Sequence, residues 1–268
     1  MAGVRSGISG QINNNIVTDG LVFYIDPAYK SSYPGSGTNI TDLIFKTIGT
    51  FHGSPTFQSA FNGIIDFDGT DDYIDTNFNT DYNYISFSFW CRRDAGVNDG
   101  TYFTRWGNGS NWSFIIREDS SNNLKIQLQC SNGSSISNTD ISLSIGDWNC
   151  YTVTFNGTIV RIYKNGIQIS TENLSGVLKS GTPDLFIGDR TTLSQSPFNG
   201  QIGPIQLYNK ALTQEQVLQN YQAQKERFGL WSQIHIKIQM VILCSQNHII
   251  WKEVIAVIMD VDIVHTKS

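Results

Sequence analysis

The chain has 268 residues, of which 12% are aromatic, 15% are charged and 24 are glycine. This length is enough for one large all-β domain with a sizeable core, and the composition suits many short strands joined by tight turns. The net charge is −5 and no run of Lys or Arg occurs, so the sequence lacks the basic footprint of a nucleic-acid-binding protein and that class is excluded.

Residues 1–19 are polar and rich in Gly, Ser and Asn, and we expect an arm, a linker or a disordered tail there. They contain no apolar segment of a signal peptide, so we expect no export by that route. The cysteines Cys91, Cys130, Cys150 and Cys244 show neither metal-site nor disulfide spacing, which favours free thiols. Cys91 and Cys130 share strand faces with apolar residues and are predicted to be small buried hydrophobes.

Short apolar or alternating runs predict strands along most of the chain, with six Asn-Gly and three Asp-Gly pairs marking turns between them. The first strand, LVFYI, is stopped by Pro27, which cannot donate to a central ladder. Residues 84–93 alternate almost perfectly and predict a central strand. Further strands are expected at residues 64–67, 73–74, 102–104, 112–117, 124–130 and 141–145, with closing strands around 184–189 and 198–203.

Residues 151–170 predict three consecutive antiparallel strands. Their alternation is interrupted at Asn156-Gly157 and Asn165-Gly166, the dipeptide that two-residue type I′ hairpin turns favour. With the preceding Trp148, this stretch resembles the signature W-x-x-Y/H-x-V-x-T-F-[DN]-G…V-x-[IL]-Y-x-[ND]-G of laminin-G-like domains in the concanavalin A-like superfamily. The resemblance implies an all-β fold, an antiparallel jelly-roll β-sandwich over residues 20–230.

Other strings resemble laminin-G-like modules of phage and other virion proteins. These are L-V-x-Y-[IL]-D, S-Y-P-G-[ST]-G-T, G-x-P-T-F and F-D-G-x-D-D-Y-I in the first third, and N-Y-x-A-x-K-x-R-F-G-L near residue 230. The chain departs from them at residues 43–48, where those modules carry a Gly/Asn-rich loop. The resemblance implies a virion protein made in the host cytoplasm, such as part of a phage tail, fibre or capsid surface.

One short C-terminal helix is expected from residue 213 to about 227. Thr213 and Gln216 form a candidate capping box, and Val217, Leu218 and Tyr221 give an apolar stripe.

The composition changes abruptly at residues 231–268, which contain no Gly, Pro, Phe or Tyr and are rich in β-branched residues. The longest uncharged run, residues 238–251, is too short and too polar for a membrane-spanning helix, so we expect no membrane insertion. Three interpretations remain: a hairpin packed on the sandwich, a strand offered to a partner, or a tail produced by a frame change in the coding sequence, which we favour.

The loop at residues 105–111 and its flanking strands form the most ligand-like part of the sequence. A Trp or Tyr face stacks on the C–H face of a sugar while Asn and Arg bind its hydroxyls, which is the chemistry of carbohydrate recognition. The alternative is that these aromatic residues fill the core. The predicted ligand-binding residues are Tyr102, Arg105, Trp106, Asn108, Asn111 and Trp112.

Three carboxylates, Asp68, Asp71 and Asp72, fall within five residues at a hairpin-like turn. They could supply oxygen ligands to Ca²⁺, or they could bind local backbone as Asx-turns do. Many laminin-G-like modules have acids where this chain has Gly203-Pro204, so one metal ligand of the wider family is missing.

These observations favour a non-catalytic carbohydrate-binding, adhesion and structural module of a virion, with glycans or other virion proteins as partners and homo-oligomerisation left open. The alternatives are a glycoside hydrolase or lyase on the same fold and a cellular adhesion module, which would need a signal peptide. Retaining glucanases of this architecture typically carry E-x-D-x-E on one strand, and this chain does not. Glu118 and Asp119 are adjacent, so their side chains should point to opposite faces of a strand.

Overall fold

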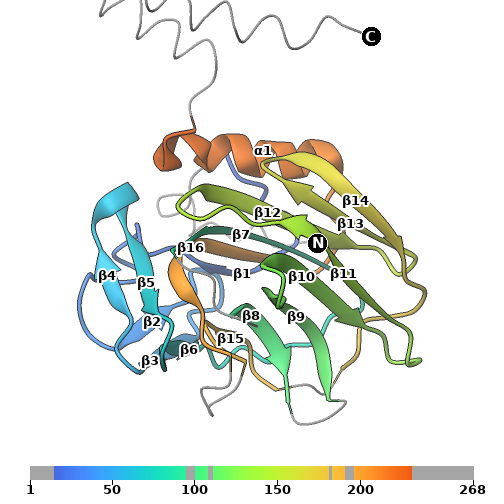
Figure 1. Cartoon of the computed structure of the whole chain (residues 1–268), viewed down its shortest axis with the longest axis horizontal. Helices are drawn as coiled ribbons and strands as arrows, with labels where there is room; N and C mark the ends of the chain where they lie inside the picture. The colour runs from blue at the N-terminus through green and yellow to red at the C-terminus, as the bar shows by residue number, and fades with distance from the viewer. Residues whose placement is uncertain (1–14, 95–99, 108–110, 181–182, 191–195, 231–268) are drawn as a thin grey trace, which may run out of the picture. The chain divides into compact units, whose positions relative to one another are not determined.

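The computed structural model describes residues 15–94, 100–107, 111–180, 183–190 and 196–230 (Figure 1). The chain divides into two compact units, Met1–Gln224 and Lys225–Ser268. The described part of the second unit contains one 3₁₀ turn, η2 (Lys225–Phe228). The predicted tail 231–268 lies outside the described residues.

The first unit contains two eight-stranded sheets, and the strands within them pair antiparallel. The first sheet has the order β14 (Ile167–Asn173), β13 (Ile159–Lys164), β12 (Trp148–Phe155), β7 (Ile85–Arg93), β16 (Asn199–Tyr208), β5 (Ile64–Asp68) and β4 (Thr56–Gln58), and β1 (Leu21–Ile25) pairs with β16. The second has the order β11 (Ser135–Ser142), β10 (Asn123–Gln129), β9 (Trp112–Glu118), β8 (Thr101–Trp106), β15 (Phe186–Ile187), β6 (Tyr73–Asp75), β3 (Ile48–His52) and β2 (Asn39–Thr41). The antiparallel jelly-roll sandwich expected from the sequence is confirmed.

The core lies between the two sheets and is built by strand alternation. In β10, Leu124, Ile126 and Leu128 are buried, while the residues between them are half-buried on the outer face. Aromatic rings of the two sheets meet edge to face: the centroid of Phe103 lies 5.1 Å from that of Phe87 and 4.9 Å from that of Phe89. This packing fixes the two sheets face to face.

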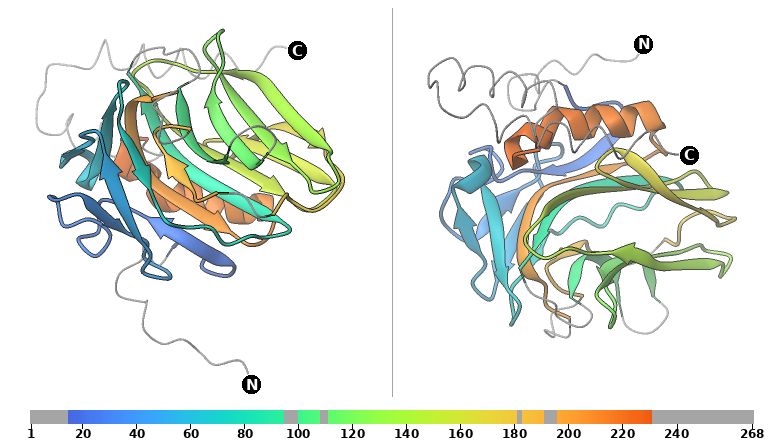
Figure 2. Two further views of the ribbon diagram at one scale, coloured as in Figure 1. Left: turned by 90° about the horizontal axis from the view of Figure 1, so that it is seen from below. Right: turned by 45° about the horizontal axis from the view of Figure 1, so that its top comes forward.

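The helix α1 (Gln214–Gln224) covers the outer face of the first sheet (Figure 2). Trp90 donates its indole N–H to Gln224 Oε1 at 2.8 Å, which ties β7 to the end of the helix. The capping box is confirmed, because the Thr213 N–H binds Gln216 Oε1 at 3.1 Å and the Gln216 N–H binds Thr213 Oγ1 at 3.3 Å. Among the described residues α1 is the only α-helix, and it lies on the first sheet; none lies on the second.

Part of the expected N-terminal arm is packed into this layer. Ile16 and Val17 are buried beside α1. The Val17 N–H donates to Asn220 Oδ1 at 2.8 Å, and the Tyr208 hydroxyl donates to the Val17 carbonyl at 3.0 Å. Residues 16 and 17 therefore belong to the folded unit; residues 1–14 lie outside the described part.

One of three predicted turns agrees with its sequence-based expectation, and two differ from it. Asn165 and Gly166 both have positive φ, 53° and 80°, as the predicted type I′ turn requires. At Asn156 the connection spans three residues instead of two, and the Asn156 side chain accepts the N–H groups of Thr158 and Ile159. The expected hairpin at residues 68–72 is wrong, because β5 belongs to the first sheet and β6 to the second, so the turn crosses between sheets.

Two further features follow from sequence chemistry. Pro204 lies inside β16, where the register with β7 shifts between Ile202 and Ile205, so the missing N–H falls at an irregularity. Cys91, Cys130 and Cys150 are free thiols, as predicted, and all three are buried, which was expected for Cys91 and Cys130. Cys244 lies outside the described residues. Within the described residues there is no helix long and apolar enough to cross a membrane.

Candidate ligand-binding site

The end of the β8–β9 hairpin presents two indoles and an amide at the surface. Trp106 closes β8 and Trp112 opens β9, and their Cα atoms are direct partners in the pairing. The Gly107 N–H donates to the Asn111 carbonyl at 2.6 Å, which closes the connection at its base. Both Trp side chains are half-buried and Asn111 is exposed, so the structure brings these three predicted residues together at the surface.

A guanidinium from a distant part of the chain completes this surface. Arg190, which follows β15, places its Cζ atom 5.0 Å from the centroid of the Trp106 ring. At Gly107 an added Cβ would lie 2.8 Å from Pro183 Cγ, so only glycine allows the two segments to approach this closely. Sequence reasoning missed Arg190, since it is 84 positions from Trp106 and has no local motif.

Tyr102 does not belong to the site. Its side chain is 0% exposed, its ring centroid lies 4.4 Å from that of Phe198, and its hydroxyl donates to Glu118 Oε1 at 3.2 Å. Burial raises the pKa of this phenol well above its ordinary value. The pairing of β8 shifts register between Thr101 and Phe103, so Tyr102 and Phe103 both turn into the core, and Tyr102 fills the core as in the alternative interpretation of these aromatic residues.

Arg105 also has another role than the predicted one. It is 3% exposed, and its guanidinium donates to the carbonyls of Pro183 (3.0 Å), Thr80 (2.9 Å) and Asn79 (2.9 Å) and to the Asp81 carboxylate (3.0 Å). Burial lowers its pKa, and Asp81 opposes that shift. Arg105 therefore fastens two neighbouring segments together and is unavailable to ligand hydroxyls.

Asn108, the remaining predicted ligand-binding residue, lies outside the described residues. The surface supported by the structure is thus Trp106, Asn111 and Trp112, to which Arg190 is added.

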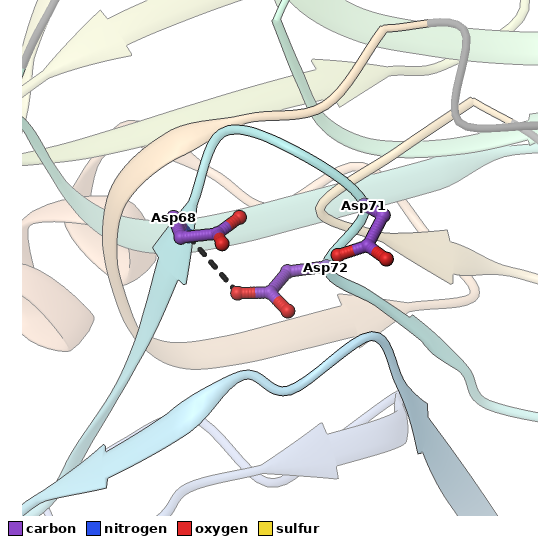
Figure 3. A group of neighbouring side chains, drawn as sticks. All are labelled: Asp68, Asp71 and Asp72. Carbon is purple, nitrogen blue, oxygen red and sulfur yellow. Dashed lines mark hydrogen bonds between the residues drawn. The ribbon is translucent and has the colours of Figure 1, made fainter.

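The predicted metal residues Asp68, Asp71 and Asp72 do come together, each with a carboxylate oxygen within 4.8 Å of the others (Figure 3). Asp72 is 2% exposed, and its two oxygens accept the N–H groups of Ser54 at 2.6 Å and of Asp68 at 2.9 Å. Asp68 accepts the N–H of Thr70 at 2.7 Å, as an Asx-turn does. Asp68 and Asp72 therefore bind local backbone amides, as the alternative to a calcium site predicts.

The same three side chains carry carboxylate oxygens, which are the type of ligand that Ca²⁺ binds. Burial raises the pKa of Asp72, and the neighbouring charges of Asp68 and Asp71 raise it further, so a cation would relieve their repulsion. Carboxylates that bind a metal are commonly hydrogen-bonded at the same time. Calcium binding stays a prediction.

The two adjacent acids considered for catalysis separate as expected. Glu118 is 0% exposed and forms an ion pair of 3.0 Å with the buried Arg93. Asp119 instead accepts the N–H groups of Ser121 and Asn123, each at 2.9 Å. Each acid thus has a structural contact of its own.

The architecture defines the class of the protein as a two-sheet jelly-roll sandwich. The chain belongs to the concanavalin A-like lectin/glucanases superfamily, whose Laminin_G_3 profile matches residues 68–218. No curated protein matches the chain in sequence.

Solved structures share the fold at low sequence identity. One is domain 4 of AbnA, an extracellular GH43 arabinanase from Geobacillus stearothermophilus, in complex with arabinotriose (TM-score 0.60, 16% identity, 75% of this chain and 98% of that one). Another is the binding domain of botulinum neurotoxin serotype D (TM-score 0.60, 16% identity, 77% and 52%). A third is Trypanosoma rangeli sialidase in complex with sialic acid (TM-score 0.59, 11% identity, 79% and 34%).

The chain therefore spans about half of the toxin binding domain and about a third of the sialidase. Two of these three structures hold a saccharide, arabinotriose or sialic acid, and the third is a toxin's binding domain.

Proposed function

We propose that the chain is a non-catalytic carbohydrate-binding module that serves adhesion, and that the surface at Trp106, Asn111 and Trp112 is its binding site. The observation that carries the proposal is the cross-strand pairing of two half-buried indoles at the tip of a hairpin. Such a pair offers apolar faces to sugar C–H groups, and Asn111 and Arg190 add donors for hydroxyls. The saccharide complexes among the structural neighbours agree with this class of ligand.

We further propose that this module is part of a virion, in its tail, a fibre or the capsid surface. Its support is the resemblance of the strings around residues 33–38 and 220–230 to laminin-G-like virion modules. Other virion chains would then be partners beside glycans. A cellular adhesion module would use the same site chemistry.

A glycoside hydrolase on this fold is the second candidate, and the geometry of the acids favours it less. Retaining hydrolysis needs two carboxyl groups about 5–5.5 Å apart that both reach the substrate. Glu118 instead lies in the core against Arg93, and Asp119 binds turn amides. Calcium at Asp68, Asp71 and Asp72 is an accessory part of the proposal, in which the ion would hold the crossing between the sheets.

The test is a glycan-array screen of the full chain, with Ca²⁺ and with chelator, beside Trp106→Ala and Trp106→Phe. We expect saccharide binding that Trp106→Ala abolishes and Trp106→Phe partly keeps, because a phenyl ring retains a stacking face. If calcium supports the site, chelation weakens binding and Asp71→Asn reproduces that loss. Array binding that is unchanged in both Trp106 variants would place the site elsewhere, and no binding by the folded protein would contradict the proposal.

A further inference from the structure

Positive charges gather on the outer face of the second sheet, beside the Trp pair. Arg117 in β9 lies directly opposite Lys125 in β10. The neighbours of Arg117 in β9, Ile116 and Glu118, are fully buried, so strand alternation turns Arg117 away from the core. Its Nε–H donates to Gln127 Oε1 at 3.2 Å, which holds the guanidinium along the sheet surface.

Arg190 brings a third charge to this face. Its guanidinium lies over Trp106, and it is near enough to Arg117 to act on that side chain. Burial, and after it the charge of Arg190, lowers the pKa of Arg117; burial and the charge of Arg117 likewise lower the pKa of Lys125. The three cations come from separate segments of the chain, and Arg117 is repelled by each of the other two, so an anion bound beside them would relieve this repulsion.

Two carboxylates of the described residues, those of Asp119 and Asp189, lie near this cluster and also bind backbone donors. Asp119 Oδ1 accepts two N–H groups, from Ser121 and Asn123. The buried Asp189 accepts the Ser196 N–H at 2.9 Å and the Arg190 backbone N–H. Asp119 raises the pKa of both Arg117 and Lys125 and so opposes their mutual repulsion. Among the described residues, the three cations outnumber these two carboxylates in a chain whose net charge is −5.

We propose that this surface, which we call the basic aromatic face (Trp106, Trp112, Arg117, Lys125 and Arg190), binds saccharides that carry carboxylate or sulfate groups. The inference rests on the proposed carbohydrate-binding function and narrows its ligand class. Guanidinium groups bind planar or tetrahedral oxyanions through paired N–H donors, and the indoles supply the stacking surface for the ring.

Single-stranded nucleic acid also combines negative charge with stacking rings. The acidic net charge and the lack of Lys/Arg runs favour a saccharide, because a nucleic-acid strand needs a basic track along its backbone. We therefore make an oligonucleotide one arm of the test.

The experiment measures binding of the immobilised full chain, in chelator, to matched pairs of polymers: polygalacturonate against its methyl ester, and dextran sulfate against dextran. The charge-loss variant is Arg117→Gln with Lys125→Gln. The control is Lys30→Gln with Arg161→Gln, which removes the same charge outside the second sheet. An oligothymidylate is the third ligand, and circular dichroism checks that every variant is folded.

We expect the anionic member of at least one pair to bind about tenfold or more tightly than its neutral partner, with an affinity that falls as salt rises. The Arg117/Lys125 variant should lose about tenfold to a hundredfold in that affinity, since charged hydrogen bonds are removed, and the control variant should not. Which pair responds distinguishes carboxylate from sulfate.

Equal binding of neutral and anionic polymers, lost in Trp106→Ala, would overturn this inference and leave the proposed function standing. No binding of any saccharide would contradict both. Equal losses of affinity in the two charge variants would mean non-specific electrostatic attraction and would overturn the inference. Tighter binding of the oligothymidylate than of either anionic polysaccharide would overturn it too.

Discussion

At the scale of single residues, the buried ion pair between Arg93 and Glu118 is expected to have a large effect on stability. Both side chains are nearly inaccessible, at 4% and 0%, and the Tyr102 hydroxyl binds the second oxygen of Glu118. Loss of one partner leaves the other charge buried and unpaired. A surface pair such as Arg92 and Asp94, about one-third exposed, has no such consequence.

Glu118→Gln should therefore lower the free energy of unfolding by about 3–5 kcal/mol, and the double variant Arg93→Met with Glu118→Gln should lose less than that. The control Asp94→Asn should cost about 0–1 kcal/mol. Urea denaturation of the three variants checks this. An equal cost for Glu118→Gln and Asp94→Asn would show that the pair is unimportant.

The raised pKa of Asp72 predicts how the stability of the protein depends on pH. Burial raises its folded-state pKa above the ordinary 3.8, so the folded state binds this proton more tightly than the unfolded state. The contribution of Asp72 to stability should fall as pH rises from 3.8 through the raised pKa, and stay constant above it. The difference in unfolding free energy between wild type and Asp72→Asn, measured in chelator across pH, should follow that course; a difference that grows with pH would contradict it.

At the scale of secondary-structure elements, α1 depends on its contacts with the first sheet. A helix of 11 residues is marginal alone in water. Asn220 joins three segments, since its amide binds both the Val17 N–H and the Tyr208 hydroxyl. Burial raises the pKa of Tyr208, so this hydroxyl stays protonated as a donor.

Asn220→Leu should lower the free energy of unfolding by about 1–3 kcal/mol, because it leaves the buried Val17 N–H without its acceptor. Hydrogen exchange of the Val17 amide should also become faster. Its neighbour Gln219 provides a control, because it makes an exposed bond to the Asn15 carbonyl. Gln219→Ala should change stability by no more than about 0.5 kcal/mol. Equal exchange rates of Val17 in wild type and Asn220→Leu would show that the network does not hold the segment.

Elements specified by local chemistry could be predicted from the sequence, and those specified by distant partners could not. Period-two alternation and an Asn-Gly turn gave β13 and β14, and the capping box gave the start of α1. The bulge that buries Tyr102 depends on the pairing of β8 with β9, and the carbonyls around Arg105 come from residues 79–80 and 183. The structure therefore pairs Trp106 with Trp112, buries Tyr102 in the core and adds Arg190, which the sequence did not indicate, while ligand binding at this surface stays a prediction.

At the scale of the whole sandwich, the two sheets differ in what covers their outer faces. The first sheet carries α1 over a second apolar cluster (Figure 2). The second sheet carries the hairpin with the paired indoles and the basic aromatic face. Among the described residues, helix packing is thus confined to the outer face of the first sheet, and the proposed binding surface lies on the second.

The most direct test of the central claim is an NMR titration that follows the indole N–H signals while a pool of neutral and acidic oligosaccharides is added to the full chain. Single Trp→Phe variants assign the signals. We expect the signals of Trp106 and Trp112 to shift, while that of Trp90, fully buried and bound to Gln224, stays in place. Unchanged Trp106 and Trp112 signals, with binding seen elsewhere or not at all, would contradict the account.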